Sequence, residues 1–460
     1  MNPRAKLMEY FFSPKSIAVI GASQQERSIG KAVLENFISG GFGGKVYAVN
    51  PNHKKIMGKA CYASVKEIPH AVDAAVVVVP SKFVPMVLKE CGKKGVKAVT
   101  IISAGFGEIG EKGLTAELAA IMHKYKNKMR VVGPNCLGVL DTASGVDMLF
   151  LPRSRMGRPG KGVVSFISQS GALGSAILDW DAMKGYGVNK FVSYGNAMDV
   201  DEADLIEYLA HDKSTKVVVV YVEGVREGRK FFSVAKKMGF KKPIIAIKGG
   251  MTEGGAKAAH SHTGSLAGSA EVYKAVFRQA NIVHAHTMEE VFDFARVFST
   301  EPAPRGKRVQ VITDGGGYGV LGTDALVQNG LEMAEISGKT KMLIKSKSPA
   351  YAVIANPIDL TGDADNKRYE VAVNAVLADK NVDMLLLILL FQVPTLEKGI
   401  VESVYKVLKN RKKPVVVMSA GGVYSERQRM HLEKKGISTF MSPFDCARAL
   451  AALVDYYVDK

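Results

Sequence analysis

A histidine-bearing segment of small residues carries the most distinctive chemistry of this chain. Residues 256–268 read Ala-Lys-Ala-Ala-His-Ser-His-Thr-Gly-Ser-Leu-Ala-Gly, so His260 and His262 lie among alanines, glycines and hydroxyl side chains. Small residues let a backbone bend and approach a ligand closely, and imidazole can act as a nucleophile near neutral pH. The composition predicts a mobile loop whose histidine receives and passes on a group, with a phosphoryl group as the favoured candidate. A solvated surface loop fits the same composition.

Three strand-to-helix junctions are rich in glycine and offer backbone N–H groups and a helix dipole to an anion. The first begins at Gly21, the second spans 168–174 and includes Ser168, Ser170 and Gly171, and the third spans 314–319 and includes Gly316 and Gly317. None ends in the Gly-Lys-Ser/Thr of a Walker A loop. Together with the histidine segment, the second and third junctions predict a phosphate held between two helix N-termini.

A phosphorylated or attacking imidazole needs a carboxylate to hold its other nitrogen and offset its charge. Glu223 is the candidate, because it directly follows the predicted strand 217–222, in the same unit as the histidine segment. Glu227 and Asp199 are possible substitutes. A helix cap or a surface charge is the competing interpretation for each of these acidic residues.

The elements that position these groups alternate short β-branched runs with amphipathic segments, which is typical of α/β folds with parallel sheets. Each strand ends at small or turn-forming residues, where open α/β sheets bind ligands. Residues 301–307 are predicted to be a linker. The predicted strands form three units: 16–20, 46–49, 74–79 and 98–102; then 162–167, 217–222 and 243–247; then 309–313, 383–390 and 414–418.

Composition bounds the class of protein. The chain has 460 residues, 47% of them apolar, and four scattered cysteines without metal or disulfide spacing, so no metal site is predicted. The absence of a long apolar run or a signal-peptide pattern predicts a cytoplasmic protein with no membrane partner. The net charge of +18 is spread along the chain, which suits an anionic small molecule, an acidic partner or a lysine-rich surface better than nucleic acid.

Four motifs resemble the α subunits of ADP-forming acetyl-CoA synthetases, which are nucleoside-diphosphate-forming acyl-CoA synthetases alongside succinyl-CoA synthetase. They are the histidine segment with its Ser-His-Thr-Gly-Ser-Leu-Ala-Gly core, and the segments 168–174, 133–138 and 356–360. The resemblance covers essentially the whole chain. It implies three consecutive doubly wound domains: a Rossmann-like CoA-binding domain over 1–142, a flavodoxin-like ligase domain with the phosphohistidine over 143–300, and a second flavodoxin-like ligase-CoA domain over 306–460.

The resemblance also implies a reaction. An acyl-CoA such as acetyl-CoA and phosphate give an acyl phosphate and CoA, and the phosphoryl group passes to a histidine and then to ADP. By motif match the histidine is His262, with His260 as the local alternative, and Glu223 steadies the phosphohistidine. Ser168, Ser170, Gly171, Gly316 and Gly317 bind phosphate. The implied CoA contacts are Gly21, Ser23, Asn50, Pro51, Lys54, Pro80, Ser103, Ala104 and Asn135.

No segment remains for an ATP-grasp nucleotide site once three α/β units are counted. The resemblance therefore implies a partner β subunit that holds ADP or ATP with Mg²⁺, in an α2β2 assembly. The glycines on both sides of His262 are the predicted hinges for a travelling histidine, namely Gly249, Gly250, Gly254 and Gly255 before it and Gly264 and Gly268 after it. The rival interpretations are a CoA-binding regulatory protein without catalysis and a succinyl-CoA synthetase-like α subunit. A Rossmann dehydrogenase is disfavoured because the second strand ends in Asn50-Pro51 rather than an acidic residue.

Overall fold

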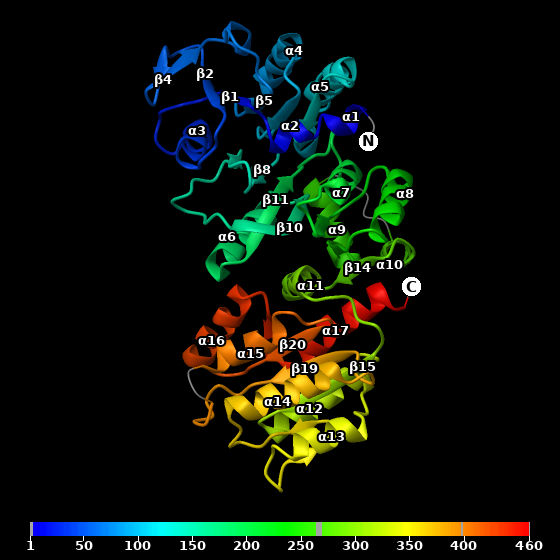
Figure 1. Cartoon of the computed structure of the whole chain (residues 1–460). Coiled ribbons are helices and arrows are strands. Elements are labelled where there is room, and N and C mark those ends of the chain that lie inside the picture. Colours follow the sequence, from blue (N-terminus) through cyan, green and yellow to red (C-terminus); the bar gives the residue numbers. More distant parts are fainter. Residues whose placement is uncertain (1–2, 264–268, 397–398, 460) are drawn as a thin grey trace. The chain divides into compact units, whose positions relative to one another are not determined.

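The computed structural model describes residues 3–263, 269–396 and 399–459 and has the predicted α/β fold (Figure 1). The chain divides into two compact units, Met1–His284 and Ala285–Lys460. The first unit is built on two sheets of mostly parallel strands, and the second on one. None of the helices in the described part of the chain has the length and apolar character needed to cross a lipid bilayer.

The first sheet has the strand order β3-β4-β2-β1-β5-β6-β7. Its neighbouring strands run parallel except for the hairpin of β3 and β4. The strands are β1 (Ser16–Ile20), β2 (Lys45–Val49), β3 (Lys55–Ile56), β4 (Lys59–Tyr62), β5 (Ala74–Val77), β6 (Ala98–Ile101) and β7 (Arg130–Val132). The helices are α1 (Pro3–Lys6), α2 (Glu9–Phe12), α3 (Ile29–Ser39), α4 (Val84–Lys94) and α5 (Lys112–Tyr125), with 3₁₀ turns η1 (Val65–Glu67), η2 (Ser81–Phe83) and η3 (Gly107–Ile109).

The second sheet has the strand order β14-β13-β12-β10-β11-β8-β9, with β8 antiparallel to both of its neighbours. Its strands are β8 (Gly138–Asp141), β9 (Val146–Asp147), β10 (Gly160–Ser168), β11 (Gly187–Ser193), β12 (Val217–Val222), β13 (Ile244–Lys248) and β14 (Ile282–Ala285). Its helices are α6 (Gly171–Lys184), α7 (Glu202–His211), α8 (Gly228–Gly239), α9 (Glu253–Thr263) and α10 (Ala270–Gln279).

The third sheet, in the second unit, has the order β17-β18-β15-β19-β20-β21, with β16 paired to β15. Glu301, at the start of the predicted linker, is buried and pairs with Arg411 at 2.7 Å. The strands are β15 (Arg308–Thr313), β16 (Glu332–Met333), β17 (Val353–Ile354), β18 (Ile358–Asp359), β19 (Met384–Ile388), β20 (Val415–Met418) and β21 (Ser438–Phe440). The helices are α11 (Met288–Thr300), α12 (Gly316–Gln328), α13 (Gly338–Lys345), α14 (Asn366–Ala378), α15 (Ile400–Leu408), α16 (Val423–Lys434) and α17 (Pro443–Tyr457).

One apolar core joins the two sheets of the first unit. It includes Phe12 of α2, Ile17 of β1, Val139 of β8 and Tyr208 of α7. The Phe12 and Tyr208 rings stack with centroids 5.0 Å apart. Because this core is continuous, the carboxyl ends of strands from both sheets are held in a fixed relation to each other.

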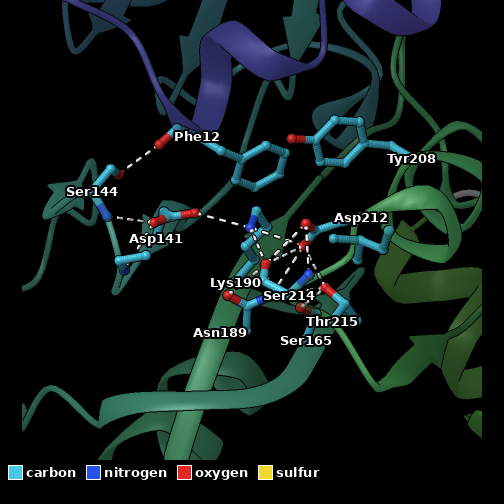
Figure 2. Close-up of polar contacts among 12 residues, drawn as sticks. Phe12, Asp141, Ser144, Ser165, Asn189, Lys190, Tyr208, Asp212, Ser214 and Thr215 are labelled. Atoms are coloured by element: carbon cyan, nitrogen blue, oxygen red, sulfur yellow. Dashed lines mark hydrogen bonds and ion pairs between the residues drawn. The ribbon is translucent and has the colours of Figure 1, made fainter.

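A buried polar cluster fastens the edge of the second sheet to the N-terminal helices (Figure 2). Lys190 Nζ on β11 lies 3.2 Å from Asp141 Oδ2 on β8 and 2.9 Å from Asp212 Oδ2. Asp212 also accepts a hydrogen bond from Thr215 Oγ1 at 2.7 Å. Ser144, after β8, donates its hydroxyl to the carbonyl of Phe12 at 2.6 Å. A buried cation with two carboxylates is tolerated here because each charge is paired and hydrogen-bonded.

Candidate active site

A cavity of about 1060 Å³ opens where strands of the first two sheets end. Of the residues predicted from the sequence, Pro80, Ser103, Ala104 and Asn135 line it from the first sheet, and Ser170 and Gly171 line it from the second. Their meeting follows from the rule that ligands bind beyond the carboxyl ends of parallel strands. The volume lies just above the usual range for small-molecule sites, which is about 300–1,000 Å³.

The helix α6 begins inside this cavity. Ser170 caps it, since its hydroxyl accepts from Leu173 N at 3.3 Å, and Gly171 is the first helical residue. Ser168 is fully buried and donates its hydroxyl to the Ser170 carbonyl at 2.7 Å. Ser168 therefore shapes the turn before the helix, whereas Ser170 and Gly171 face the cavity. The N-terminus of a 14-residue helix favours an anion here.

The remaining predicted CoA residues surround the ends of β1 and β2 and do not line the cavity. Gly21 has a φ of +94°, and a Cβ there would lie 3.0 Å from the Val78 carbonyl oxygen, so the turn requires glycine. Asn50 donates its side-chain amide to the Ala22 carbonyl at 2.8 Å, which ties the two strand ends together. Ser23 accepts from Gln25 N at 3.0 Å. Pro51 and Lys54 are exposed.

Glu223 is buried, with 6% of its surface exposed, directly after β12. Tyr221 donates its hydroxyl to Glu223 Oε1 at 3.1 Å. The backbone N–H of Glu223 donates to Gln169 Oε1 at 2.7 Å, and Gln169 lines the cavity. Burial lowers the pKa of Lys248, and the negative charge of Glu223 opposes that shift. The carboxylate is thus held by Tyr221 of its own strand, and the backbone of Glu223 is held by the Gln169 side chain, which precedes α6.

The possible substitutes for Glu223 have other surroundings. Asp199 accepts from Arg130 Nε at 3.0 Å and from Arg4 Nη2 at 2.6 Å, so it pairs two arginines. Glu227 precedes α8 and makes no side-chain cap.

The histidine segment is helical as far as Thr263, as part of α9, so the prediction of a loop is wrong for residues 256–263. Alanines favour a helix, and Glu253 pairs with Lys257 at 2.9 Å one turn on. These preferences outweigh Gly254 and Gly255, which lie inside the helix rather than in a hinge. Residues 264–268 lie outside the described residues, as do the side chains of His260 and His262, and the predicted role of either histidine stays a prediction.

The third glycine-rich junction lies in the second unit. Gly316 and Gly317 open α12, as predicted, and Gly315 is its N-cap. The preceding Asp314 accepts from Leu390 N at 3.1 Å, and burial raises the pKa of Asp314 to about 6. The pairing of this helix N-terminus with that of α6 stays a prediction, because the two helices belong to different units.

Two charged residues of the cavity were missed from the sequence. Among the described residues that line it, Glu108 and Arg226 are the charged ones. Arg226 lies three residues after Glu223 on the same strand-end loop, so the rule that selected Glu223 could have found it. Glu108 lies on a 3₁₀ turn, and its partner Asn196 is 88 positions away in the sequence. No local pattern links these two residues.

Comparison with known protein families gives three matches in chain order. Residues 15–142 match the CoA binding domain, residues 161–298 the succinyl-CoA ligase like flavodoxin domain, and residues 309–457 the ligase-CoA domain. The fold and these three matched domains together define a CoA-binding ligase.

Individual relatives narrow this class. The chain is 44% identical to the α subunit of ADP-forming acetate–CoA ligase II of Pyrococcus furiosus, over 97% of each chain. It is 41% identical to ADP-forming acetate–CoA ligase I of Archaeoglobus fulgidus, covering 98% of this chain and 64% of that one. A solved structure of acetyl-coenzyme A synthetase 1 from Candidatus Korarchaeum cryptofilum, in complex with phosphate and ADP, matches with a TM-score of 0.91 and 39% identity, over 98% and 96% of the two chains.

The chain belongs to the ADP-forming acetate–CoA ligase family, and its similarity to the α subunit extends over nearly its whole length. The family includes α subunits of this length and longer single chains. Its enzymes are therefore either assembled from subunits or fused.

Proposed function

We propose that this chain is the α subunit of an ADP-forming acyl-CoA ligase, with acetyl-CoA as its reference substrate, and that the phosphoryl group travels through His262. The observation that carries the proposal is the similarity to the P. furiosus α subunit over 97% of both chains. A cavity of about 1060 Å³ at the strand ends supports it, because a CoA thioester and phosphate need a large site with both polar and apolar walls.

The proposed reaction has three steps. A phosphate oxygen attacks the thioester carbonyl carbon, the carbon–sulfur bond breaks, and CoA leaves as the thiolate. An imidazole nitrogen of His262 attacks the phosphorus of the acyl phosphate, and the free carboxylate leaves. A terminal oxygen of ADP then takes the phosphoryl group from His262, which gives ATP and restores the imidazole.

The residues of the first unit have proposed roles in these steps. The α6 N-terminus at Ser170 and Gly171 binds phosphate with backbone N–H groups, with Ser168 supporting the turn from behind. Pro80, Ser103, Ala104 and Asn135 contact the pantetheine and thioester, and Gly21, Ser23, Asn50, Pro51 and Lys54 contact the CoA nucleotide. Glu223 holds the imidazole of His262 in one orientation and offsets its positive charge.

Transfer to ADP is assigned to a partner. We propose a β subunit with an ATP-grasp domain that binds ADP with Mg²⁺, in an α2β2 assembly, and a second phosphate contact at Gly316 and Gly317. The longer single-chain relatives, of which this chain spans 64%, support a missing portion of this kind. The domain boundaries 1–142, 143–300 and 306–460 and a cytoplasmic location are part of the same proposal.

The test is to incubate the purified chain with acetyl-CoA and labelled phosphate, with and without the β subunit, and to map the label under conditions that preserve phosphohistidine. We expect label on His262, lost in His262→Ala and retained in His260→Ala. Label that follows His260 instead would overturn the assignment of the histidine. No label in either condition would favour a CoA-binding protein without this catalysis, and faster labelling from succinyl-CoA would favour the succinyl-CoA synthetase-like alternative.

A further inference from the structure

Three polar side chains form a chain of hydrogen bonds along the wall of the cavity. Asn196 Nδ2 donates to Glu108 Oε2 at 2.6 Å, and Asn135 Nδ2 donates to Asn196 Oδ1 at 3.3 Å. All three residues line the cavity. They come from three separate segments, namely η3, the residues after β7 and the residues after β11.

The Glu108 carboxylate fixes the direction of this chain. Its Oε1 also accepts from Gly105 N at 2.5 Å and Phe106 N at 3.1 Å. Burial would raise the pKa of Glu108, but these hydrogen bonds and the one from Asn196 outweigh it and lower the pKa. An ionised carboxylate only accepts, so Asn196 must present its NH2 to Glu108 and its oxygen to Asn135. Asn135 must then present its NH2 to Asn196.

The backbone around Asn135 and Asn196, at the other end of these hydrogen bonds, is equally constrained. Asn135 has a φ of +59°, and its N–H donates to the Ser103 carbonyl at 3.0 Å. Asn196 N donates to the Pro134 carbonyl at 3.0 Å. A Cβ on Gly195 would lie 2.3 Å from both the Asn135 and the Pro134 carbonyl oxygens, so the two segments approach as closely as glycine allows. With the backbone fixed in this way, the side-chain amides of Asn135 and Asn196 could still flip. The hydrogen bond from Asn196 to the Glu108 carboxylate prevents both flips.

We propose that Glu108 and Asn196 are positioning residues for acyl transfer, and that they hold the carboxamide of Asn135 with one N–H directed at the thioester carbonyl oxygen. The inference rests on the proposed function. One N–H of Asn135 donates to Asn196, and the other is available to a ligand in the cavity. A donor held in place before the reaction stabilises the negative charge that develops on the carbonyl oxygen when phosphate attacks.

The test uses the donor-to-acceptor direction of the hydrogen bonds that link Asn135, Asn196 and Glu108. In Glu108→Gln the side chain can still accept from Gly105 and Phe106, but it then presents an NH2 to the NH2 of Asn196. In Asn196→Asp a carboxylate faces Glu108. The double variant Glu108→Gln with Asn196→Asp restores every donor–acceptor pair, because the introduced glutamine can donate to the introduced aspartate, and that aspartate can accept from Asn135. The control is Glu111→Gln, since Glu111 caps α5 on the same segment and does not line the cavity.

The measurement is the steady-state rate of CoA release from saturating acetyl-CoA, phosphate and ADP, by thiol titration, in the α chain assembled with its β subunit. We expect each single variant to lower kcat by about tenfold or more, as loss of a carbonyl-oxygen donor does. We expect the double variant to recover to within about threefold of wild type, with little change in KM for phosphate throughout. Glu111→Gln is expected to match wild type.

The outcomes distinguish a failure of the positioning role from a failure of the proposed function. Single variants as fast as wild type, or a double variant no faster than the singles, would overturn the positioning role while leaving the proposed function intact. A wild-type enzyme that releases no CoA would overturn both. If Glu108→Gln does not fold, Asn196→Ala breaks the same chain without altering the Glu108 turn. Full activity of that variant would overturn the positioning role equally.

Discussion

Replacing Lys190 by methionine tests whether the polar cluster of Figure 2 stabilises the first unit. The Lys190 side chain is 8% exposed, and its partners Asp141 and Asp212 are 4% and 16% exposed. Methionine fills much of the lysine volume but leaves two carboxylates without their cation. Breaking a buried ion pair by removing one partner costs about 3–5 kcal/mol. We expect about 3 kcal/mol, the lower end, because Asp212 is partly exposed and keeps hydrogen bonds from Ser214 and Thr215.

The pH dependence gives the prediction a sign. Burial would raise the pKa of Asp212, but hydrogen bonds from Thr215, Lys190 and Ser214 hold it below its usual range. A carboxyl with a lowered folded-state pKa stabilises the fold above its unfolded pKa of about 3.9, and that stability is lost as the pH falls through the folded value. The deficit of Lys190→Met should therefore be full near neutral pH and shrink below about pH 4, as the Asp212 carboxylate becomes protonated.

Urea unfolding followed by tryptophan fluorescence measures this directly, because the only tryptophan of the chain, Trp180, lies in α6 of the same unit. The control is Lys213→Met, an exposed lysine next to Asp212, which we expect to change the free energy of unfolding by less than about 0.5 kcal/mol. A loss in Lys190→Met no larger than in the control, or a deficit that grows as the pH falls, would refute the reasoning.

The other predictions concern the cavity and the second unit. Arg226→Gln should raise KM for phosphate about tenfold, because it removes a cation that lines the same cavity as the α6 N-terminus. Steady-state kinetics against Arg229→Gln, an exposed arginine outside the cavity, checks this, and equal KM values in both variants would contradict it. Glu223→Gln should slow histidine phosphorylation by about tenfold or more, measured by rapid-quench labelling. The Kd for CoA, measured by calorimetry, should stay unchanged. Equally small effects on the rate and on the Kd would contradict the role of Glu223. Because the pKa of Asp314 is raised in the folded protein, wild type should lose stability as the pH rises from about 4 to 6. In Asp314→Asn the stability of the second unit should change little over this range, and thermal unfolding at several pH values measures the difference.

The fold could be predicted where local composition and tertiary environment agree. Strands β1 and β12 have the predicted bounds, because their β-branched runs are buried on both faces and end at turns. Strand β11 was missed, since Asn189 and Lys190 make it read as polar. Its polar residues are buried only because Asp141 and Asp212, distant in sequence, pair with them. Helix α9 was missed for the opposite reason: its glycines suggested a loop, while its alanines and an ion pair one turn apart favour a helix.

The same division applies to the cavity. Pro80, Ser103, Asn135 and Ser170 could be found one strand end at a time, because the topology of a parallel sheet places every strand end at one edge. Glu108 matters only through Asn196, and that pair exists because the shared core of the first unit brings the ends of β6, β7 and β11 together. Rules about where one strand ends can predict which residues contact a substrate. The residues that orient them cannot be predicted in this way, because they come together only when the two sheets pack. The Glu108→Gln and Asn196→Asp pair therefore tests that packing as directly as it tests the chemistry.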